Sequence, residues 1–362
     1  MRRIRTDVGH EAWQATSYAE VRALLTDDRL GRSHRDPENA ARTGDSALLG
    51  GPHGDFDTER EDHARMRRLL RPFFAPKRMR ELQPRVEELT TQVLDRFAER
   101  TGPADLHAEV AVSLPLQVIC ELLGASYADR EEIRTWTLAA VDPADRDLSM
   151  AGIVELHQYS LRLTARKRRE PGDDVISQLC AEEGLSDEEI AGYATLLLFA
   201  GQETAVVQIG LGVLRLLTHP GEWRSLLDRP DLIVPMVDEL LRLSGEASNR
   251  GLPRYARTDL VVGGETIRAG DLVLLDLGSA NHDPDVFPSP DRCDPARAGN
   301  HLLFGHGGSF CLGAPLARME LRALFGQLVP RFPEMRLAVP VGELDFRPDV
   351  LTECLTALPV TW

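Results

Sequence analysis

Residues 303–315 read LFGHGGSFCLGAP, a glycine-rich loop that brings one cysteine to the start of a helix. The helix continues as LARMEL after Pro315, and proline is tolerated in a first turn because no main-chain N–H there has a helical acceptor. The positive end of a helix lowers the pKa of a nearby thiol, so we expect Cys311 to serve as a thiolate ligand for a soft metal. A small buried hydrophobe is the commoner role of a lone cysteine, and the loop alone leaves both interpretations open.

Length and composition limit the class of protein. The chain has 362 residues and no Ser/Gly/Pro-rich linker, which predicts one large domain over residues 1–362. Its net charge of -15 argues against a nucleic-acid partner. No apolar run follows the charged residues 1–7, so we expect a soluble cytoplasmic protein without membrane contact. Free thiols in a reducing compartment are expected, because the five cysteines are odd in number and scattered, at positions 120, 180, 293, 311 and 354.

Helical periodicity dominates the first two thirds of the chain. Capping boxes are predicted at Ser17 with Glu20 and at Ser186 with Glu189. Residues 30–62 lack the helical period and predict a long loop. A turn at Gly263-Gly264 predicts a hairpin over 259–267, followed by strands at 271–276 and 355–362. Helices are predicted over residues 17–26, 62–74, 79–101, 114–123, 129–140, 150–169, 173–182, 186 onward, 220–227 and 232–244. The fold class is therefore mainly α with a minor β part.

The helix that begins at Ser186 carries polar residues in an apolar stretch. Gly201, Glu203 and Thr204 lie within LLLFAGQETA, residues 196–205. Glycine costs about 1 kcal/mol relative to alanine inside a helix, and a buried carboxylate costs more. Either these residues open a functional groove, or Gly201 packs against another helix while Glu203 reaches solvent. The segment alone favours neither interpretation.

The cysteine loop resembles the haem-binding loop of the cytochrome P450 family, whose pattern is Phe-x-x-Gly-x-x-x-Cys-x-Gly. Phe304, Gly307, Cys311 and Gly313 occupy its four places. The resemblance extends from about residue 13 to residue 362, and it implies a triangular, mostly helical prism with small β-sheets. It also implies haem b as the cofactor, with Cys311 as the axial ligand of the iron and Phe304, Gly305, Ser309 and Gly313 around the haem.

The same resemblance gives the 201–204 segment a catalytic role. In the family this helix lies over the haem, where a glycine opens a groove for dioxygen and water. On that mapping Gly201 is the groove residue, Thr204 hydrogen-bonds the bound dioxygen, and Glu203 supplies protons.

Haem carries two propionates, and the resemblance implies basic residues that neutralise them. His63 and Arg67 match one such place, and Arg254 matches another. Two residues before the cysteine the family commonly has His or Arg, but this chain has Ser309. Serine carries no charge, so haem retention is expected to depend on the other three residues or on a further cation that the sequence does not identify.

Glu239 and Arg242 lie three residues apart and can pair on one helix face. This spacing most often indicates a surface salt bridge. Pro288–Arg292 resembles the family segment that supplies a second arginine, which implies a buried structural network of Glu239, Arg242 and Arg292 that braces the cysteine loop.

Substrate contacts are the least constrained part of the sequence. The resemblance implies contacts from residues 30–62, 141–150, 197–200, 245–251 and 351–352. The polar stretch GEASNRG, residues 245–251, leads to the hypothesis that Asn249 or Arg250 meets a polar group on a small molecule. The candidate pocket residues are Leu197, Ala200, Ser248, Asn249, Arg250 and Leu351.

The expected reaction is dioxygen-dependent monooxygenation, chiefly hydroxylation, of a small molecule in bacterial secondary metabolism. Oxidative coupling or cyclisation of an aromatic or peptide substrate is the main alternative. A peroxygenase and a non-catalytic haem-fold recruitment module are further ones. We expect a monomer that receives electrons from a ferredoxin and its reductase.

Two further features concern that electron donor and the start of the chain. Residues 60–85 hold nine basic against three acidic residues, which indicates either an acidic donor's docking site or a solvated helix face. The family usually has several tens of residues before the segment at Trp13, so part of its N-terminal helix and strand region is expected to be missing.

Overall fold

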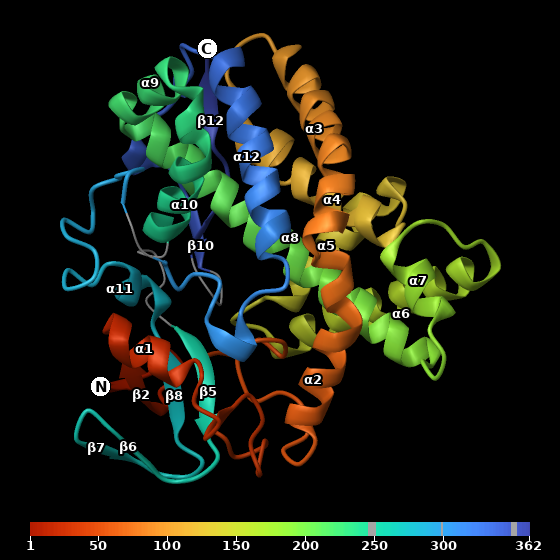
Figure 1. The fold of residues 1–362 in the computed structure, drawn as a ribbon, viewed down its shortest axis with the longest axis vertical. Coiled ribbons are helices and arrows are strands. Elements are labelled where there is room, and N and C mark those ends of the chain that lie inside the picture. Colours follow the sequence, from red (N-terminus) through yellow and green to blue (C-terminus); the bar gives the residue numbers. More distant parts are fainter. Residues whose placement is uncertain (245–250, 298–299, 349–352) are drawn as a thin grey trace.

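The computed structural model describes residues 1–244, 251–297, 300–348 and 353–362, and most of them are helical (Figure 1). The five-stranded sheet lies at the lower left of Figure 1, and helices make up most of the remainder. The helices are α1 Tyr18–Leu24, α2 Glu59–Leu70, α3 Pro76–Ala98, α4 Ser113–Leu123, α5 Arg130–Ala140, α6 Arg146–Arg169, α7 Val175–Ala181, α8 Asp187–Thr218, α9 Pro220–Asp228, α10 Ile233–Leu243, α11 Leu277–Asn281 and α12 Ala314–Arg331.

The strands form four small sheets. The largest has the order β1-β2-β8-β5-β3, in which β2 and β8 are parallel and the other pairs antiparallel. Its strands are β1 Arg2–Arg5, β2 Glu11–Ala15, β3 Leu30–Gly31, β5 Leu252–Ala256 and β8 Leu272–Leu275. The others pair β6 Leu260–Val262 with β7 Glu265–Ile267, β10 Phe346–Pro348 with β11 Glu353–Leu355, and β12 Pro359–Thr361 with both β4 Ala104–Asp105 and β9 Arg336–Leu337.

Helix α8 runs through the middle of the helical part and organises it. It begins with the predicted capping box, in which Ser186 and Glu189 satisfy each other's main-chain N–H groups. It packs against α4 and α6 and also contacts α10 and α12. By length and composition α8 could cross a membrane, but 67% of its apolar window is buried inside the molecule, as in the core helix of a soluble protein.

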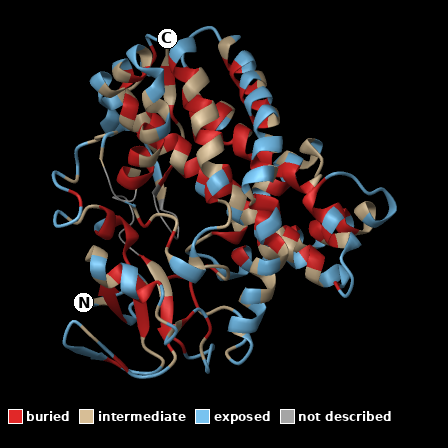
Figure 2. Ribbon diagram, viewed as in Figure 1, coloured by how far each residue is buried: buried red, intermediate tan, exposed pale blue. Residues whose placement is uncertain are grey.

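Two larger hydrophobic cores and a small third cluster around Tyr255 hold these parts together. The main core joins helices α2 to α10, α12 and the C-terminal strands. A second core lies between the sheet and α1, where Trp13, Val21, Ile267 and Val273 pack together. Figure 2 shows buried residues concentrated along α8 and on the strands of the large sheet.

Several boundaries differ from those predicted. The expected loop over residues 30–62 contains β3 and the first turn of α2. Helix α6 begins at Arg146 rather than 150, because the Asp145 carboxylate caps it at the Leu148 N–H. Ser17 caps α1 as expected, but Glu20 pairs with the Met1 ammonium instead of closing a capping box. Strands β1, β2 and β5 were not predicted, since their stability depends on partners distant in the sequence.

Candidate functional site

Main-chain hydrogen bonds fold the cysteine loop onto itself before α12. The Cys311 N–H donates to the Phe304 carbonyl at 2.8 Å, and the Phe310 N–H donates to Gly307 at 3.1 Å. Gly305 and Gly307 have φ values of +74° and +62°, a region that side chains disfavour, and a Cβ at Gly307 would overlap Thr26. The loop can therefore adopt this course only with glycine at these places.

The Cys311 thiol is exposed, although protein surrounds much of it. Burial raises its pKa, while N–H groups of Gly313 and Ala314 and the charges of Arg67 and Arg318 act to lower it. The net direction is upward, so the expectation that the helix start lowers this pKa is wrong for the chain on its own. Desolvation outweighs the helix terminus because protein surrounds the thiol on most sides, although one side of it is open.

A brace on α10 and α12 holds Phe304, and the sequence did not reveal it. The Arg318 guanidinium lies 4.5 Å from the Phe304 ring centre and donates to the Asp238 carboxylate at 2.7 Å. Burial tends to raise the pKa of Asp238, but His301 at 3.8 Å and the hydrogen-bonded Arg318 lower it to about 2. The loop is thus tied to α10 through an aromatic ring and a charged pair.

Glu239 and Arg242 form the predicted buried pair, and its second arginine is Arg297. Arg242 donates two hydrogen bonds to the Glu239 carboxylate, at 2.8 and 3.0 Å. Arg297 Nε donates to Glu239 Oε2 at 3.2 Å. The side chain expected from Arg292 is exposed, and that residue contributes its main-chain carbonyl to both arginines. The chain turns between 292 and 297, so the charged side chain comes from five residues later than predicted.

One stripe of α8 lies exposed along the middle of the helix, where the other residues are buried or half-buried. It consists of Leu196, Ala200 and Thr204, at a spacing of four residues. The Thr204 hydroxyl donates to the Ala200 carbonyl at 2.9 Å, which leaves its lone pairs free to accept a hydrogen bond. Of the two pocket residues predicted on this helix, Ala200 belongs to the stripe, whereas Leu197 packs into the main core.

Gly201 lies on a different side of α8, against α4. A Cβ there would come within 2.7 Å of Ile119 Cδ1. This contact explains the glycine by helix packing, the simpler of the two interpretations that the sequence left open. The groove role predicted for Gly201 finds no support in this geometry.

Glu203 is buried and does not reach the surface as a solvated group. Its carboxylate lies 3.7 Å from a guanidinium nitrogen of Arg347, which is itself 38% exposed. Both side chains line a cavity of about 110 Å³, together with His107, Arg134 and Thr356. Because Arg347 is partly exposed, this polar cavity links a buried carboxylate to the solvent-facing side of β10.

The predicted propionate-binding residues gather in one basic cluster, which also includes Arg32. Neighbouring charges from Arg32, Arg67 and Arg254 add to burial in lowering the pKa of His63. The Arg67 guanidinium donates to the Phe310 carbonyl at 2.8 Å, which joins α2 to the cysteine loop. Arg254 is 7% exposed, and its side chain donates to the Pro253 carbonyl at 2.8 Å. A region with this surplus of positive charge fits a dianionic group such as the two propionates of haem.

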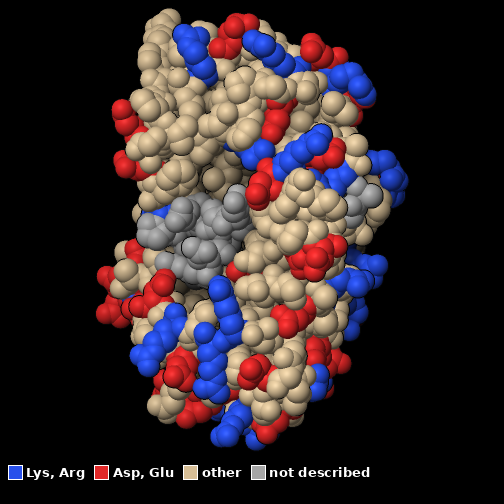
Figure 3. All heavy atoms as spheres, turned by 90° about the vertical axis from the view of Figure 1, so that its left-hand side faces the viewer, with Lys and Arg blue, Asp and Glu red and all other residues tan. Residues whose placement is uncertain are grey.

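The basic excess of residues 60–85 is smaller in space than in sequence. Ion pairs engage Arg65 with Glu189, Lys77 with Glu81, Arg78 with Asp173, and Arg85 with Glu121. Within the described chain, Arg68, Arg71 and Arg80 are exposed without an ion pair. Figure 3 shows a different face, the left-hand side of Figure 1, away from α2 and α3, and there acidic and basic side chains are interspersed.

Other expectations fall elsewhere. Ser248, Asn249, Arg250 and Leu351 lie outside the described residues. All five cysteines are free, as predicted.

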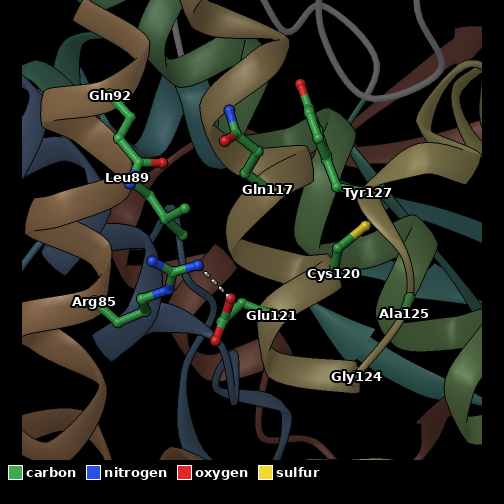
Figure 4. Close-up of a pocket in the computed structure, with 9 residues that line it drawn as sticks. All are labelled: Arg85, Leu89, Gln92, Gln117, Cys120, Glu121, Gly124, Ala125 and Tyr127. Carbon is green, nitrogen blue, oxygen red and sulfur yellow. Dashed lines mark hydrogen bonds and ion pairs between the residues drawn. The ribbon is translucent and has the colours of Figure 1, made fainter.

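A hollow of about 360 Å³ between α3 and α4 is lined by Gln117, Cys120 and Tyr127, and the pair Arg85–Glu121 crosses one side of it (Figure 4). It includes no residue of the cysteine loop or of the basic cluster.

Comparisons with known proteins agree along the whole chain. Residues 231–337 match the sequence profile named Cytochrome P450. Pentalenolactone synthase of Streptomyces exfoliatus is 41% identical over 99% of this chain and 92% of its own length. Mycinamicin IV hydroxylase/epoxidase of Micromonospora griseorubida is 38% identical, also over 99% of this chain and 92% of its own. The X-ray structure of substrate-free cytochrome P450 PimD, a pimaricin epoxidase, superposes with a TM-score of 0.91 at 41% identity, over 100% of this chain and 92% of that one.

Proposed function

This chain belongs to the cytochrome P450 family and is a monooxygenase of that family, and on this premise we propose that it hydroxylates a small organic molecule of bacterial secondary metabolism. The observation that carries the proposal is the exposed thiol of Cys311 at the start of α12, beside a basic cluster that fits a dianion. A thiol ligand and a set of propionate-binding cations are the two things that a haem site needs from its protein.

The family implies a haem cofactor, and the residues of this chain fit one. Cys311 would hold the iron, and His63, Arg67 and Arg254 would hold the propionates. When bound, the haem supplies the iron centre at which dioxygen is activated. The glycines at 305 and 307 and the Arg318–Phe304 contact fix the position of Cys311 before any ligand arrives.

Thr204 and Glu203 divide the handling of protons between two sides of α8. The Thr204 hydroxyl is held by the Ala200 carbonyl and offers its lone pairs on the exposed stripe. The buried Glu203 carboxylate contacts the polar cavity at Arg347. We assign Glu203 the transfer of protons from that cavity. We assign Thr204 the hydrogen bond that positions dioxygen, the acceptor of those protons, on the stripe.

The exposed stripe of α8 supports a bulky and mainly apolar substrate. Leu196 and Ala200 present aliphatic groups on either side of one turn, with Thr204 as the polar end of the stripe. The relative PimD is described as an epoxidase of pimaricin, a polyene macrolide antibiotic. A macrolide is therefore the substrate class that we propose.

We further propose a monomeric cytoplasmic enzyme that a ferredoxin reduces at the cysteine-loop side. Arg68 and Arg71 are exposed at the end of α2, and Arg67 of the same helix bonds to Phe310. Exposed cations at the rim of a protein–protein interface raise the rate of association with an acidic partner more than they raise the affinity for that partner.

Turnover under ¹⁸O₂ with a reduced ferredoxin tests the proposed reaction. We expect one labelled oxygen atom in the product of a substrate that shifts the absorption spectrum of the protein. A product without the label would favour oxidative coupling or cyclisation. Turnover with hydrogen peroxide but none with reduced ferredoxin would favour a peroxygenase.

A further inference from the structure

Arg32 lies close to a propionate-binding residue, although nothing in the sequence singled it out. Strand β3 pairs antiparallel with β5, with Leu30 opposite Ala256 and Gly31 opposite Tyr255. β3 ends at Gly31, and the Arg32 carbonyl accepts a hydrogen bond from the His53 N–H, so Arg32 directly follows this pairing without being part of it. The pairing therefore brings Arg32 next to the strand that carries Arg254.

A second contact ties Arg32 to the helix that carries His63 and Arg67. The Arg32 main-chain N–H donates to Glu59 Oε1, in the first turn of α2, at 2.7 Å. Glu59, His63 and Arg67 are spaced by four residues and therefore occupy one side of α2. The backbone at Arg32 is thus held beside both elements of the basic cluster.

Glu59 offsets only part of the positive charge of this cluster. Its charge acts to raise the pKa of Arg32 and of Arg254, but its oxygens accept from the N–H and hydroxyl groups of Ser33 and from the guanidinium of Arg257, which lies at 3.1 Å. Through the described part of the chain, neither Arg32 nor Arg254 forms an ion pair. Like charges held close together repel each other, so the arrangement favours binding of an anion between them.

Titration behaviour agrees with this geometry. Burial, and then the charge of Arg32, lower the pKa of Arg254 to about 10. Desolvation also lowers the pKa of Arg32, even though its side chain is exposed, because protein surrounds it on several sides. Both guanidinium groups remain charged at neutral pH, and neither forms an ion pair with a described residue.

We propose that Arg32 is a fourth propionate-binding residue, which supplies the positive charge that Ser309 lacks. The two positions are connected, because Gly307 in the 307–309 turn packs against Thr26 of the segment leading to β3. This inference rests on the proposed haem binding. Arg32 acts in retention of the cofactor and takes no part in the chemistry.

Haem loss from the purified holoprotein tests the proposal, measured as transfer to excess apomyoglobin. A charge-assisted hydrogen bond contributes about 1.5–3 kcal/mol, so Arg32→Gln should speed transfer about ten- to a hundredfold. Arg32→Lys keeps the charge and should remain within a few-fold of the wild type. Arg29→Gln is the matched control, because Arg29 is exposed, lies three residues earlier and pairs with Asp27.

A second substitution separates a charge effect from a structural one. Ser309→Arg should restore slow haem loss in the Arg32→Gln background, and should change it much less in the wild type. Equal rates for Arg32→Gln and Arg29→Gln would overturn the proposal, as would fast loss that Ser309→Arg does not correct. Rates of haem loss are compared only for preparations whose reduced CO spectrum is of the thiolate type. A wild-type protein that never binds haem would count against the proposed function and not against the role of Arg32.

Discussion

At the scale of single residues, Glu203 and Thr204 are neighbours whose side chains have different surroundings. Thr204 lies on the exposed stripe of α8, and Glu203 is buried beside Arg347 and a polar cavity. A helix turns by about 100° per residue, so adjacent residues can serve two compartments. The proposed roles use this separation, with protons taken up on one side of the helix and a hydroxyl presented on another.

Thr204→Ala should uncouple electron consumption from product formation. Loss of the hydroxyl removes the hydrogen bond that positions dioxygen for protonation. The yield of product per NADPH should therefore fall by about tenfold or more, and hydrogen peroxide should accumulate. Thr218→Ala is the matched control, because the Thr218 hydroxyl makes the same bond to a carbonyl four residues earlier on α8. Equal coupling in the two variants would contradict the role of Thr204.

Residue-level prediction succeeded where a motif has fixed spacing. Cys311 and its flanking glycines are adjacent in sequence, and their loop follows from local geometry alone. Arg32, Asp238 and Arg297 were missed because they join the site through partners 27 to 80 residues away or through a turn. The fit of Glu203 to Arg347 likewise depends on β10, which has no local signal in the sequence.

At the scale of elements, α10 and α12 support the cysteine loop through two charged clusters. Asp238 contacts α12 through Arg318, and Glu239 contacts the segment after α11 through Arg242 and Arg297. Adjacent residues on α10 therefore connect the two chain segments that flank the loop.

Glu239→Ala should destabilise the fold strongly. It leaves the guanidinium of Arg242, which is 1% exposed, without a counter-charge, at a cost of about 3–5 kcal/mol in the free energy of unfolding. Arg297→Ala removes one hydrogen bond to the carboxylate and three to main-chain carbonyls, but it should cost less because Arg242 and Glu239 still neutralise each other. The exposed pair Arg229–Asp231 gives the control, since Asp231→Ala should leave urea unfolding unchanged. If Glu239→Ala had the same urea midpoint of unfolding as Asp231→Ala, the Glu239 network would not stabilise the fold.

Glu320 on α12 gives a pH-dependent prediction of known sign. It is 2% exposed, its Oε2 makes no hydrogen bond within the described residues, and burial raises its pKa well above 4.5. The folded state therefore binds a proton that the unfolded state releases, and wild-type stability should decrease as pH rises above 4.5, by about 1.4 kcal/mol for each unit of raised pKa.

Glu320→Gln removes this titration. The variant should be more stable than the wild type at about pH 8, and the difference should shrink towards about pH 5, as followed by urea unfolding at both values. Parallel stability curves for the two proteins would show that Glu320 does not titrate as its burial requires.

Element-level prediction was accurate for helices with strong local signals. The capping box at Ser186 and the hairpin at Gly263-Gly264 were confirmed. The large sheet was found only in part, because β3 and β5 are short strands that become stable on pairing with each other. Since that pairing brings Arg32 next to the strand that carries Arg254, the proposed fourth cation could not be identified from the sequence.

At the scale of the whole molecule, a protein of net charge -15 keeps free cations beside the cysteine loop. Reduction by a ferredoxin should slow as ionic strength rises from about 50 to 300 mM, because salt screens exposed charges. Arg68→Glu with Arg71→Glu should slow it further at low salt and remove much of the salt dependence. Arg224→Glu on α9 is the control, and an equal effect there would argue against this docking face.

The central claim is that Cys311 binds haem iron as a thiolate. The most direct test is the spectrum of the reduced protein with carbon monoxide, compared with that of Cys311→Ser. We predict a Soret band at about 450 nm in the wild type, as thiolate ligation requires, and its loss in the variant. A folded, haem-loaded wild type without this band, or a Cys311→Ser protein that keeps it, would contradict the account.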